Sequence, residues 1–284
     1  MKPAPFEYEA PASLDAALEL LARHGGDAKV LAGGQSLIPL LNLRLAAPEL
    51  LVDLRRVPGL NEIARNGDEL VIGATVRQRQ AERDPLVAEA APLVTAALAE
   101  VGHPQIRSRG TVGGSIAHAD PAAELPAALV ALDGRVIARG PGGERSIAAA
   151  DFYLGFLTTA LDDDEILVAV ALPAAPPRTG AACVEIAQRA GDYAACGAVA
   201  QVTLGDAGTI AQARVALIGA TDRPVRAAAV EEALAGGASI ADAAGHAGDG
   251  VEPIDDPRVP SAYRTHLAGV VTRRALEQAR SRAA

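Results

Sequence analysis

The chain has 284 residues, half of them hydrophobic, and a formal net charge of −9 at pH 7. A chain of this length is expected to form about two domains with a substantial apolar core. The acidic charge argues against a nucleic-acid-binding protein, which would present a basic face. Aromatic residues make up 2% and there is no Trp, so base-stacking platforms are not expected either.

Two cysteines, Cys183 and Cys196, occur outside any CxxC spacing. The chain is therefore not expected to ligate an iron–sulfur cluster or a structural zinc. The two thiols could pair, but two buried free cysteines that act as small apolar residues are the favoured interpretation. The N-terminal residues lack the basic-then-apolar pattern of a signal peptide, and no run reaches the ~18 apolar residues of a membrane span. We expect a cytoplasmic protein.

The first helix is predicted from an N-cap residue, Ser13, followed by leucines at helical spacing and ended by Gly25 and Gly26. Apolar runs then alternate with helical segments, and residues 102–110 are expected to form a loop. The other elements expected up to residue 172 are strands at 29–32, 50–54, 69–73, 135–138 and 165–172 and helices at 37–45, 87–101 and 124–132.

A proline-rich segment at residues 173–180 is the predicted domain boundary. It gives domains at 1–175 and 176–284, the first divided into subdomains at about 1–57 and 58–175. Strands are expected in the second domain at 183–188, 197–204 and 213–218, and helices at 225–234 and 263–282. The fold class is therefore α+β.

Two glycine-rich motifs stand about eighty residues apart. The first is Ala32-Gly33-Gly34-Gln35-Ser36, between a predicted strand and a predicted helix. The second is Thr111-Val112-Gly113-Gly114-Ser115, followed by His118, Asp120 and Glu124. Glycine permits positive φ, so that consecutive N–H groups can point into one concavity, and a helix start favours an anion. The pair suggests a diphosphate held from two sides.

Other interpretations of these residues stay open. Each motif could be an ordinary turn, and neither matches the GxGxxG or Walker fingerprint. His118 and Asp120 could bind a metal, but no further ligands follow at useful spacing. Ser36, His118 and Asp120 could form a triad, although no nucleophile elbow supports it. Residues 191–193, Gly-Asp-Tyr, could be a simple turn, and Asp162-Asp163-Asp164 a solvated one.

At these motifs the chain resembles the FAD-binding (medium) subunits of molybdenum hydroxylases, the group of carbon monoxide dehydrogenase and xanthine dehydrogenase-like enzymes. The resemblance spans nearly the whole chain. Besides the two glycine motifs, it rests on Phe6-x-Tyr8, Leu51-Val52-Asp53-Leu54, Gln105-Ile106-Arg107, Asp120-Pro121, Gly191-Asp192-Tyr193-Ala194, Tyr263-Arg264 and Arg273-Arg274-Ala275.

The resemblance implies a two-subdomain FAD-binding fold of the vanillyl-alcohol oxidase (PCMH) type and a C-terminal α+β domain. It places both glycine motifs at the FAD diphosphate, Asp120 and Glu124 along the ribityl or adenosine side, and Tyr193 near the isoalloxazine ring. The cofactor-binding residues that it implies are Ala32, Gly33, Gly34, Gln35, Ser36, Leu37, Ile106, Thr111, Gly113, Gly114, Ser115, Ala117, Asp120, Glu124, Leu167 and Tyr193. No residue of this chain is expected to be catalytic or to bind a metal.

The family function implies an electron-transfer subunit. Electrons would pass from [2Fe–2S] clusters on a small subunit to FAD and then to an external acceptor, while a large subunit carries the molybdenum cofactor. A dimer of heterotrimers, a heterohexamer, is the expected assembly. The alternative is a self-sufficient FAD-dependent oxidase on the same scaffold. Four residues depart from the family pattern: Gln35 (usually His), Ser115 (usually Asn), Glu124 (usually Asp) and Glu185 (often Lys).

Overall fold

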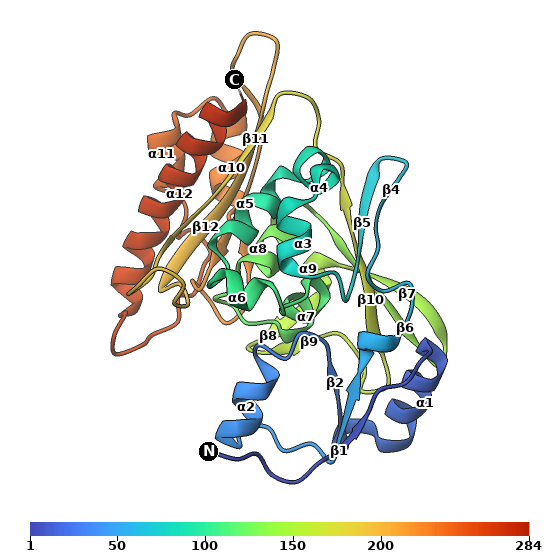
Figure 1. Ribbon diagram of the computed structural model, residues 1–284. Coiled ribbons are helices and arrows are strands. Elements are labelled where there is room, and N and C mark those ends of the chain that lie inside the picture. Colours follow the sequence, from blue (N-terminus) through green and yellow to red (C-terminus); the bar gives the residue numbers. More distant parts are fainter. Residues whose placement is uncertain (284) are drawn as a thin grey trace.

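The computed structural model describes residues 1–283, and it places three sheets one after another along the chain (Figure 1). A small parallel sheet forms the N-terminal lobe, a five-stranded antiparallel sheet forms the middle, and a four-stranded antiparallel sheet with a long helix forms the C-terminal part. The mixture of helices and strands confirms the predicted α+β class.

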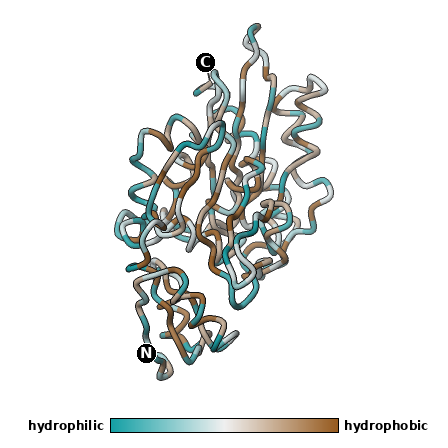
Figure 2. The backbone as a smooth tube through the Cα atoms, turned by 90° about the vertical axis from the view of Figure 1, so that its right-hand side faces the viewer, coloured by the Kyte–Doolittle hydropathy of each residue, from teal (hydrophilic) through white to brown (hydrophobic). Residues whose placement is uncertain are grey.

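The N-terminal lobe contains β1 (Glu7–Glu9), β2 (Ala28–Leu31) and β3 (Leu50–Asp53), in the order β1-β3-β2 with both pairs parallel. Parallel neighbours need a crossover, and the helices α1 (Leu14–His24) and α2 (Leu37–Leu43) supply it. Ser13 caps α1 as predicted, because its hydroxyl accepts the Ala16 N–H at 3.2 Å. Figure 2 shows this lobe standing apart below the rest of the chain.

The middle sheet has the strand order β4-β5-β10-β6-β7. These strands are β4 (Ile63–Asn66), β5 (Glu69–Gly73), β6 (Arg135–Gly140), β7 (Gly143–Ala148) and β10 (Ile166–Pro173). The helices here are α3 (Gln78–Arg83), α4 (Pro85–Ala90), α5 (Pro92–Glu100), α6 (Pro104–Arg107), α7 (Val112–His118), α8 (Glu124–Ala131) and α9 (Ala149–Phe152). A small hairpin of β8 (Tyr153–Gly155) and β9 (Thr158–Thr159) follows α9.

The C-terminal sheet is ordered β11-β12-β13-β14 along the chain. Its elements are β11 (Thr179–Ile186), β12 (Cys196–Leu204), β13 (Ile210–Ile218), β14 (Val225–Arg226), α10 (Ala228–Ala235), α11 (Ile240–Ala244) and α12 (Ser261–Ala283). One face packs on α12 and the other on α5 and α8. Along β11, Ala181 and Cys183 join the core of the middle part, while Ala182 joins the core under α12. This alternation is the period of two expected of a strand buried on both faces.

Three predicted elements were wrong in detail. The helix expected at 87–101 is two helices, because Pro92 cannot continue α4 and instead starts α5. The loop expected at 102–110 contains α6, which Pro104 begins. The helix expected at 225–234 starts only at Ala228, since Val225 and Arg226 pair with β13.

Candidate functional site

The two glycine motifs are in direct contact, and Gly33 makes that contact. A Cβ atom added to Gly33 would lie 2.6 Å from the Arg109 carbonyl oxygen and 2.8 Å from the Gly110 Cα. A Cβ added to Gly114 would lie 3.4 Å from the Cβ of Ala32. The structure therefore joins the loops that begin α2 and α7 into one feature, here called the cradle (residues 32–37 and 109–115).

The first motif has the free donors that an anion needs. It lies between β2 and α2, as predicted, and Gly34 has φ +73°, which favours glycine. Within residues 1–283, the backbone N–H groups of residues 34–37 donate no hydrogen bond to the protein, and Ser36 makes no side-chain cap to α2. The Gln35 amide turns back and donates to the Gly33 carbonyl at 3.3 Å. These N–H groups are left to bind solvent or a ligand.

The second motif differs from the predicted turn, because it is the first turn of α7. Thr111 is the N-cap, and its hydroxyl accepts the Gly114 N–H at 3.0 Å. The Gly113 N–H is donated to the Ala74 carbonyl at 3.0 Å, and a Cβ on Gly113 would lie 2.6 Å from the Ala74 Cα. These glycines permit close packing, and the expectation of a second row of free N–H groups is not met at Gly113 and Gly114.

Tyr193 links the C-terminal domain to the cradle. It lies in the loop between β11 and β12, and the nearby Ser36 side chain is the one group that acts to lower the pKa of its hydroxyl. Tyr193 is 65% exposed, yet partial burial and the charge of Asp120 raise the pKa of Tyr193. The structure thus brings Tyr193 to the first motif, which the spacing alone could not show.

Glu124 and Glu185 are acidic residues with raised pKa values beside this site. Glu124, at the start of α8, is 9% exposed, and burial raises its pKa to about 8, aided by Glu185 and Glu100. Burial also raises the pKa of Glu185 to about 7, with Glu100 as the second cause. Asp120 is used locally, since its carboxylate accepts the Ala122 N–H at 2.9 Å.

The remaining predicted residues lie on elements around the cradle. Leu37 begins α2, Ser115 and Ala117 lie in α7, and Ile106 is 38% exposed on α6. Leu167 is buried in β10, where the pairing with β6 shifts register. β10 is in contact with α7, so Leu167 lies in the layer behind the second motif.

The structure gives no support to the metal or triad interpretations. Among the described residues there is no group of three or more His, Cys, Asp or Glu side chains that could hold a metal ion. The Asp120 carboxylate accepts the Ala122 N–H, and within residues 1–283 no hydrogen bond joins His118 to Ser36 or to Asp120. Burial lowers the pKa of His118, although Asp120 acts in the opposite direction.

Three further residues hold the site together: Arg107 and Arg264 belong to motifs that carry the family resemblance, whereas no motif pointed to His103. The His103 ring would lie 2.4 Å from a Cβ on Gly191, so it packs closely under the Tyr193 loop. Arg107 is buried and binds Glu82 at 2.9 Å, and it donates to the Val101 carbonyl at 2.8 Å. Arg264 donates to the carbonyls of Ala195, Gly219 and Ile254, and so anchors the end of the same loop.

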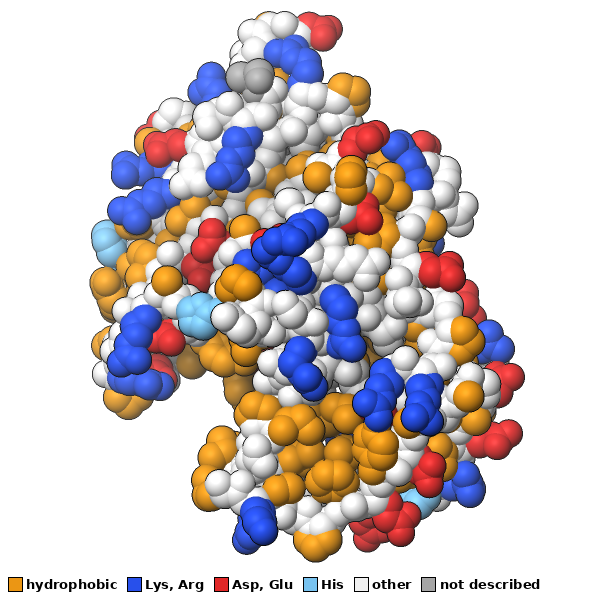
Figure 3. Space-filling view, viewed as in Figure 1, with side chains coloured by type: hydrophobic (Ala, Val, Ile, Leu, Met, Phe, Trp, Pro, Cys, Tyr) orange, Lys and Arg blue, Asp and Glu red, His pale blue; other side chains and the backbone are white. Residues whose placement is uncertain are grey.

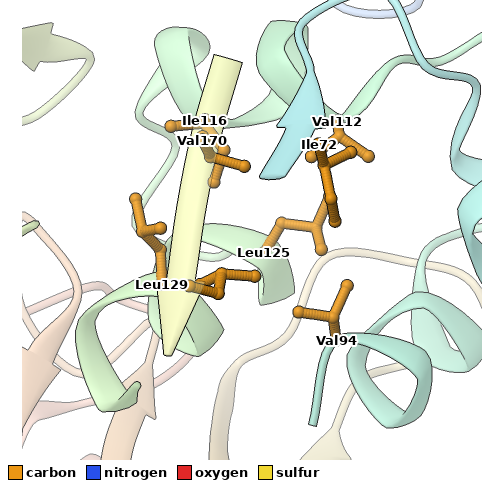
Figure 4. Close-up of a pocket in the computed structure, with 8 residues that line it drawn as sticks. Ile72, Val94, Val112, Ile116, Leu125, Leu129 and Val170 are labelled. Atoms are coloured by element: carbon orange, nitrogen blue, oxygen red, sulfur yellow. The ribbon is translucent and has the colours of Figure 1, made fainter. Parts of the chain in front are cut away.

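A cavity beneath α7 and α8 is too small and too apolar to be a substrate site. Its volume is about 10 Å³, and Figure 4 shows only aliphatic side chains around it. They are Ile72, Val94, Val112, Ile116, Leu125, Leu129, Val170 and Leu172. A cavity of this kind stays dry. Figure 3 shows a larger notch, partly lined by apolar side chains, between the N-terminal lobe and the C-terminal part.

Two family models match the chain. Residues 4–175 match the FAD-binding domain in molybdopterin dehydrogenase, and residues 182–279 match the CO dehydrogenase flavoprotein C-terminal domain. The chain belongs to the molybdopterin dehydrogenase FAD-binding family. This confirms the resemblance, the FAD cofactor and the assignment as an oxidoreductase subunit.

Relatives of this family align over the full chain. The 6-hydroxypseudooxynicotine dehydrogenase complex subunit alpha of Paenarthrobacter nicotinovorans is 40% identical, covering 100% of this chain and 97% of that protein. The carbon monoxide dehydrogenase medium chain of Hydrogenophaga pseudoflava is 37% identical, with both chains fully covered. The solved structure of that dehydrogenase superposes with TM-score 0.95 at 38% identity over both full chains. Quinoline 2-oxidoreductase from Pseudomonas putida 86 gives TM-score 0.93 at 38% identity, with 100% and 99% covered.

The family's C-terminal domain ends in α12, the longest helix. Neither α12 nor any other helix within residues 1–283 is both long and apolar enough to cross a membrane.

Proposed function

We propose that this chain holds FAD in the cradle and passes electrons through it within a molybdenum hydroxylase complex. The contact between the two glycine motifs carries the proposal, because it sets the free N–H groups of the first motif beside the start of α7. The N–H groups of residues 34–37 bind the diphosphate. Thr111, Gly113 and Gly114 shape the loop on which the first motif rests.

The cradle fits an FAD diphosphate by the chemistry of its donors. The net charge of the chain is −9, and the first motif contains no Lys or Arg. Backbone dipoles therefore offset the phosphate charge. Tyr193 lies at the isoalloxazine end and Asp120 and Glu124 toward the ribityl or adenosine end, while Ile106, Ser115, Ala117 and Leu167 border the cofactor. When bound, FAD supplies the redox chemistry, and the protein supplies position and electrostatics.

The partners that we propose are a [2Fe–2S] small subunit and a molybdenum-binding large subunit, assembled as a dimer of heterotrimers. Electrons enter from the small subunit and leave to an external acceptor. This division agrees with the two cysteines of the chain, which are both free and buried on opposite faces of the C-terminal sheet. Free thiols also agree with a reducing compartment, and we place the protein in the cytoplasm.

We divide the chain at the segment between β10 and β11, with domains at 1–175 and 176–284. The first domain holds the cradle. The second contributes Tyr193 and packs the inner face of its sheet against α5 and α8.

An absorption spectrum of the purified chain, before and after acid precipitation, tests the proposal. Flavin bands that move to the supernatant are expected and would mean FAD bound without a covalent link. A colourless chain that takes up no added FAD, alone or when co-expressed with its partners, would contradict it. Gly34→Val should abolish FAD retention, because a β-branched residue cannot adopt the φ of +73° without strain.

A further inference from the structure

A short backbone segment at the start of α3, residues 76–78, runs beside the second glycine motif. Arg77, the residue before α3, pairs with Thr111 in an isolated antiparallel bridge. The Gln78 N–H is donated to the Gly110 carbonyl at 2.9 Å. This segment is therefore joined by its backbone to the loop of the cradle against which the first motif rests.

The Gln78 side chain packs against the same loop. It is 4% exposed, and a Cβ atom added to Gly110 would lie 2.4 Å from its Oε1. On the other side of the contact between the motifs, a Cβ added to Gly33 would lie 2.8 Å from the Gly110 Cα. Gly110 is thus in close contact with both Gln78 and Gly33, which fixes the start of α3 relative to the first motif.

The Arg77 side chain reaches the contact between the two glycine motifs. Its guanidinium donates a hydrogen bond to the Arg109 carbonyl oxygen, and this is the one hydrogen bond that the side chain makes within residues 1–283. The same carbonyl oxygen would lie 2.6 Å from a Cβ on Gly33. A single carbonyl group therefore lies between the guanidinium and the first motif, and the other guanidinium N–H groups have no protein acceptor.

The positive charge of Arg77 has no acidic partner within residues 1–283. Two nearby arginines do have one, since Arg79 binds Glu82 at 2.8 Å and Arg107 binds it at 2.9 Å. Arg77 is partly buried and forms no ion pair, although the chain has 35 acidic residues and only 26 Lys and Arg. Figure 3 shows Lys and Arg side chains gathered along the middle of this face, toward the N-terminal lobe. A partly buried charge without a counter-ion, beside free N–H groups, points to an anionic ligand as its partner.

We propose that Arg77 is a binding residue for the FAD diphosphate and supplies the positive charge that the first motif lacks. One guanidinium N–H fixes the Arg109 carbonyl against Gly33, and the others are the donors offered to phosphate oxygens. Arginine suits both tasks at once, because its planar guanidinium presents five donors and stays charged. The charge acts together with the backbone N–H groups of residues 34–37. This inference rests on the proposed FAD site.

Titration of the apoprotein with oxidised FAD at several salt concentrations tests the inference. The Kd is measured by flavin fluorescence from about 0.05 M to about 1 M NaCl, a range over which salt screens charges strongly. Arg77→Gln keeps a donor for the Arg109 carbonyl but loses the charge, so it should raise the Kd about tenfold at low salt. This difference should shrink as the salt concentration rises, whereas a change in loop shape alone would persist at every concentration.

Two further variants serve as comparisons. Arg77→Lys keeps the charge and should recover most of the affinity that Arg77→Gln loses. Arg83→Gln is the matched control, because Arg83 is an exposed arginine without an ion pair at the other end of α3. It removes the same charge away from the cradle and should bind FAD as the unchanged chain does.

The outcomes separate this inference from the proposed function. If the unchanged chain binds no FAD at any salt concentration, alone or with its partners, the proposed function fails and the inference fails with it. If FAD binds but Arg77→Gln has the Kd of the unchanged chain, only the inference is overturned. A rise in Kd that is equal at low and high salt would overturn it as well, since Arg77 would then act through loop shape alone. Circular dichroism confirms folding, and Arg77→Met replaces Arg77→Gln if that variant does not fold.

Discussion

At Gly33, a methyl group would lie 2.6 Å from the Arg109 carbonyl oxygen, a distance that Cβ atoms do not reach without a backbone shift. The space beside Gly33 and Gly113 is filled by the protein itself. Gly34 is different, because its positive φ is the constraint. Glycine is therefore required for close packing at Gly33 and Gly113 but for a positive φ at Gly34, and the sequence alone does not distinguish these two roles.

Gly33→Ala should separate the two glycine motifs. We expect loss of FAD retention and a fall of about 1–3 kcal/mol in the free energy of unfolding, the usual cost of overpacking. The measurement is the flavin-to-protein absorbance ratio together with urea denaturation. Gly142→Ala is the control, since nothing lies within 4 Å of a Cβ there. Full flavin content in Gly33→Ala would show that the contact between the motifs is not needed.

Glu124→Gln should change how stability depends on pH. The pKa of Glu124 is raised to about 8 from an ordinary value of 4.5, so the folded protein binds more protons than the unfolded chain between these values. The stability that Glu124 contributes is complete below about pH 4.5 and is lost as pH rises to 8.

Because Gln does not ionise, Glu124→Gln should remove this loss of stability at high pH. Urea denaturation of the apoprotein should show equal free energies of unfolding for Glu124→Gln and the unchanged chain at pH 5. At pH 9 the variant should be more stable by about 1–3 kcal/mol. A variant that is equally stable or less stable at pH 9 would refute the raised pKa.

At the scale of elements, the sequence predicted correctly those features that depend only on neighbouring residues. The Ser13 cap, the strand at 69–73 and the strand–motif–helix order at residues 28–43 follow from capping, alternation and glycine placement. The helix at 225–234 was placed too early, because the pairing of Val225 and Arg226 with β13 is a contact between segments. The approach of Tyr193 to Ser36 and the packing of His103 on Gly191 also join distant segments, so no spacing rule could reveal them.

Arg107→Ala should loosen the α3–α6 corner that supports the second motif. Arg107 is 6% exposed, binds both oxygens of Glu82 and donates to two carbonyls at the end of α5. Removing one partner of a buried ion pair costs about 3–5 kcal/mol. Thermal denaturation should show this loss, and Arg65→Ala, which breaks an exposed pair with Glu89, should change stability by less than about 1 kcal/mol.

The stability of the protein at acidic pH gives an independent check on the Arg107–Glu82 ion pair. Burial acts to raise the pKa of Glu82, but the hydrogen bonds from Arg107 and Arg79 outweigh it and lower the pKa. The ion pair's contribution to the free energy of unfolding is present above the ordinary pKa of Glu. It is lost as the pH falls through the pKa that Glu82 has in the folded protein. The gap in stability between Arg107→Ala and the unchanged chain should therefore narrow below pH 4, and a constant gap would contradict this account.

At the scale of the whole molecule, the core beneath the cradle does not end at the domain boundary. The cluster of buried residues in the middle part includes Ala181, Cys183, Val199, Ala216 and Ile218 from the C-terminal sheet. α12 closes the other face of that sheet so tightly that a Cβ on Gly180 would lie 2.2 Å from the Ala279 carbonyl oxygen. The two family models thus meet in one apolar layer, and neither part buries its helices alone.

A fragment of residues 1–178 should therefore fold poorly. Without the C-terminal sheet, α5 and α8 lose the apolar face against which they pack. We expect the fragment to bind a hydrophobic dye, to retain no FAD and to melt at least about 10 °C below the full chain. Addition of residues 179–284 as a separate chain should restore part of both properties, because the lost contacts are apolar and non-covalent. A fragment that melts cooperatively at the temperature of the full chain with FAD bound would show that the two domains are independent, and the C-terminal sheet would then serve only to carry Tyr193.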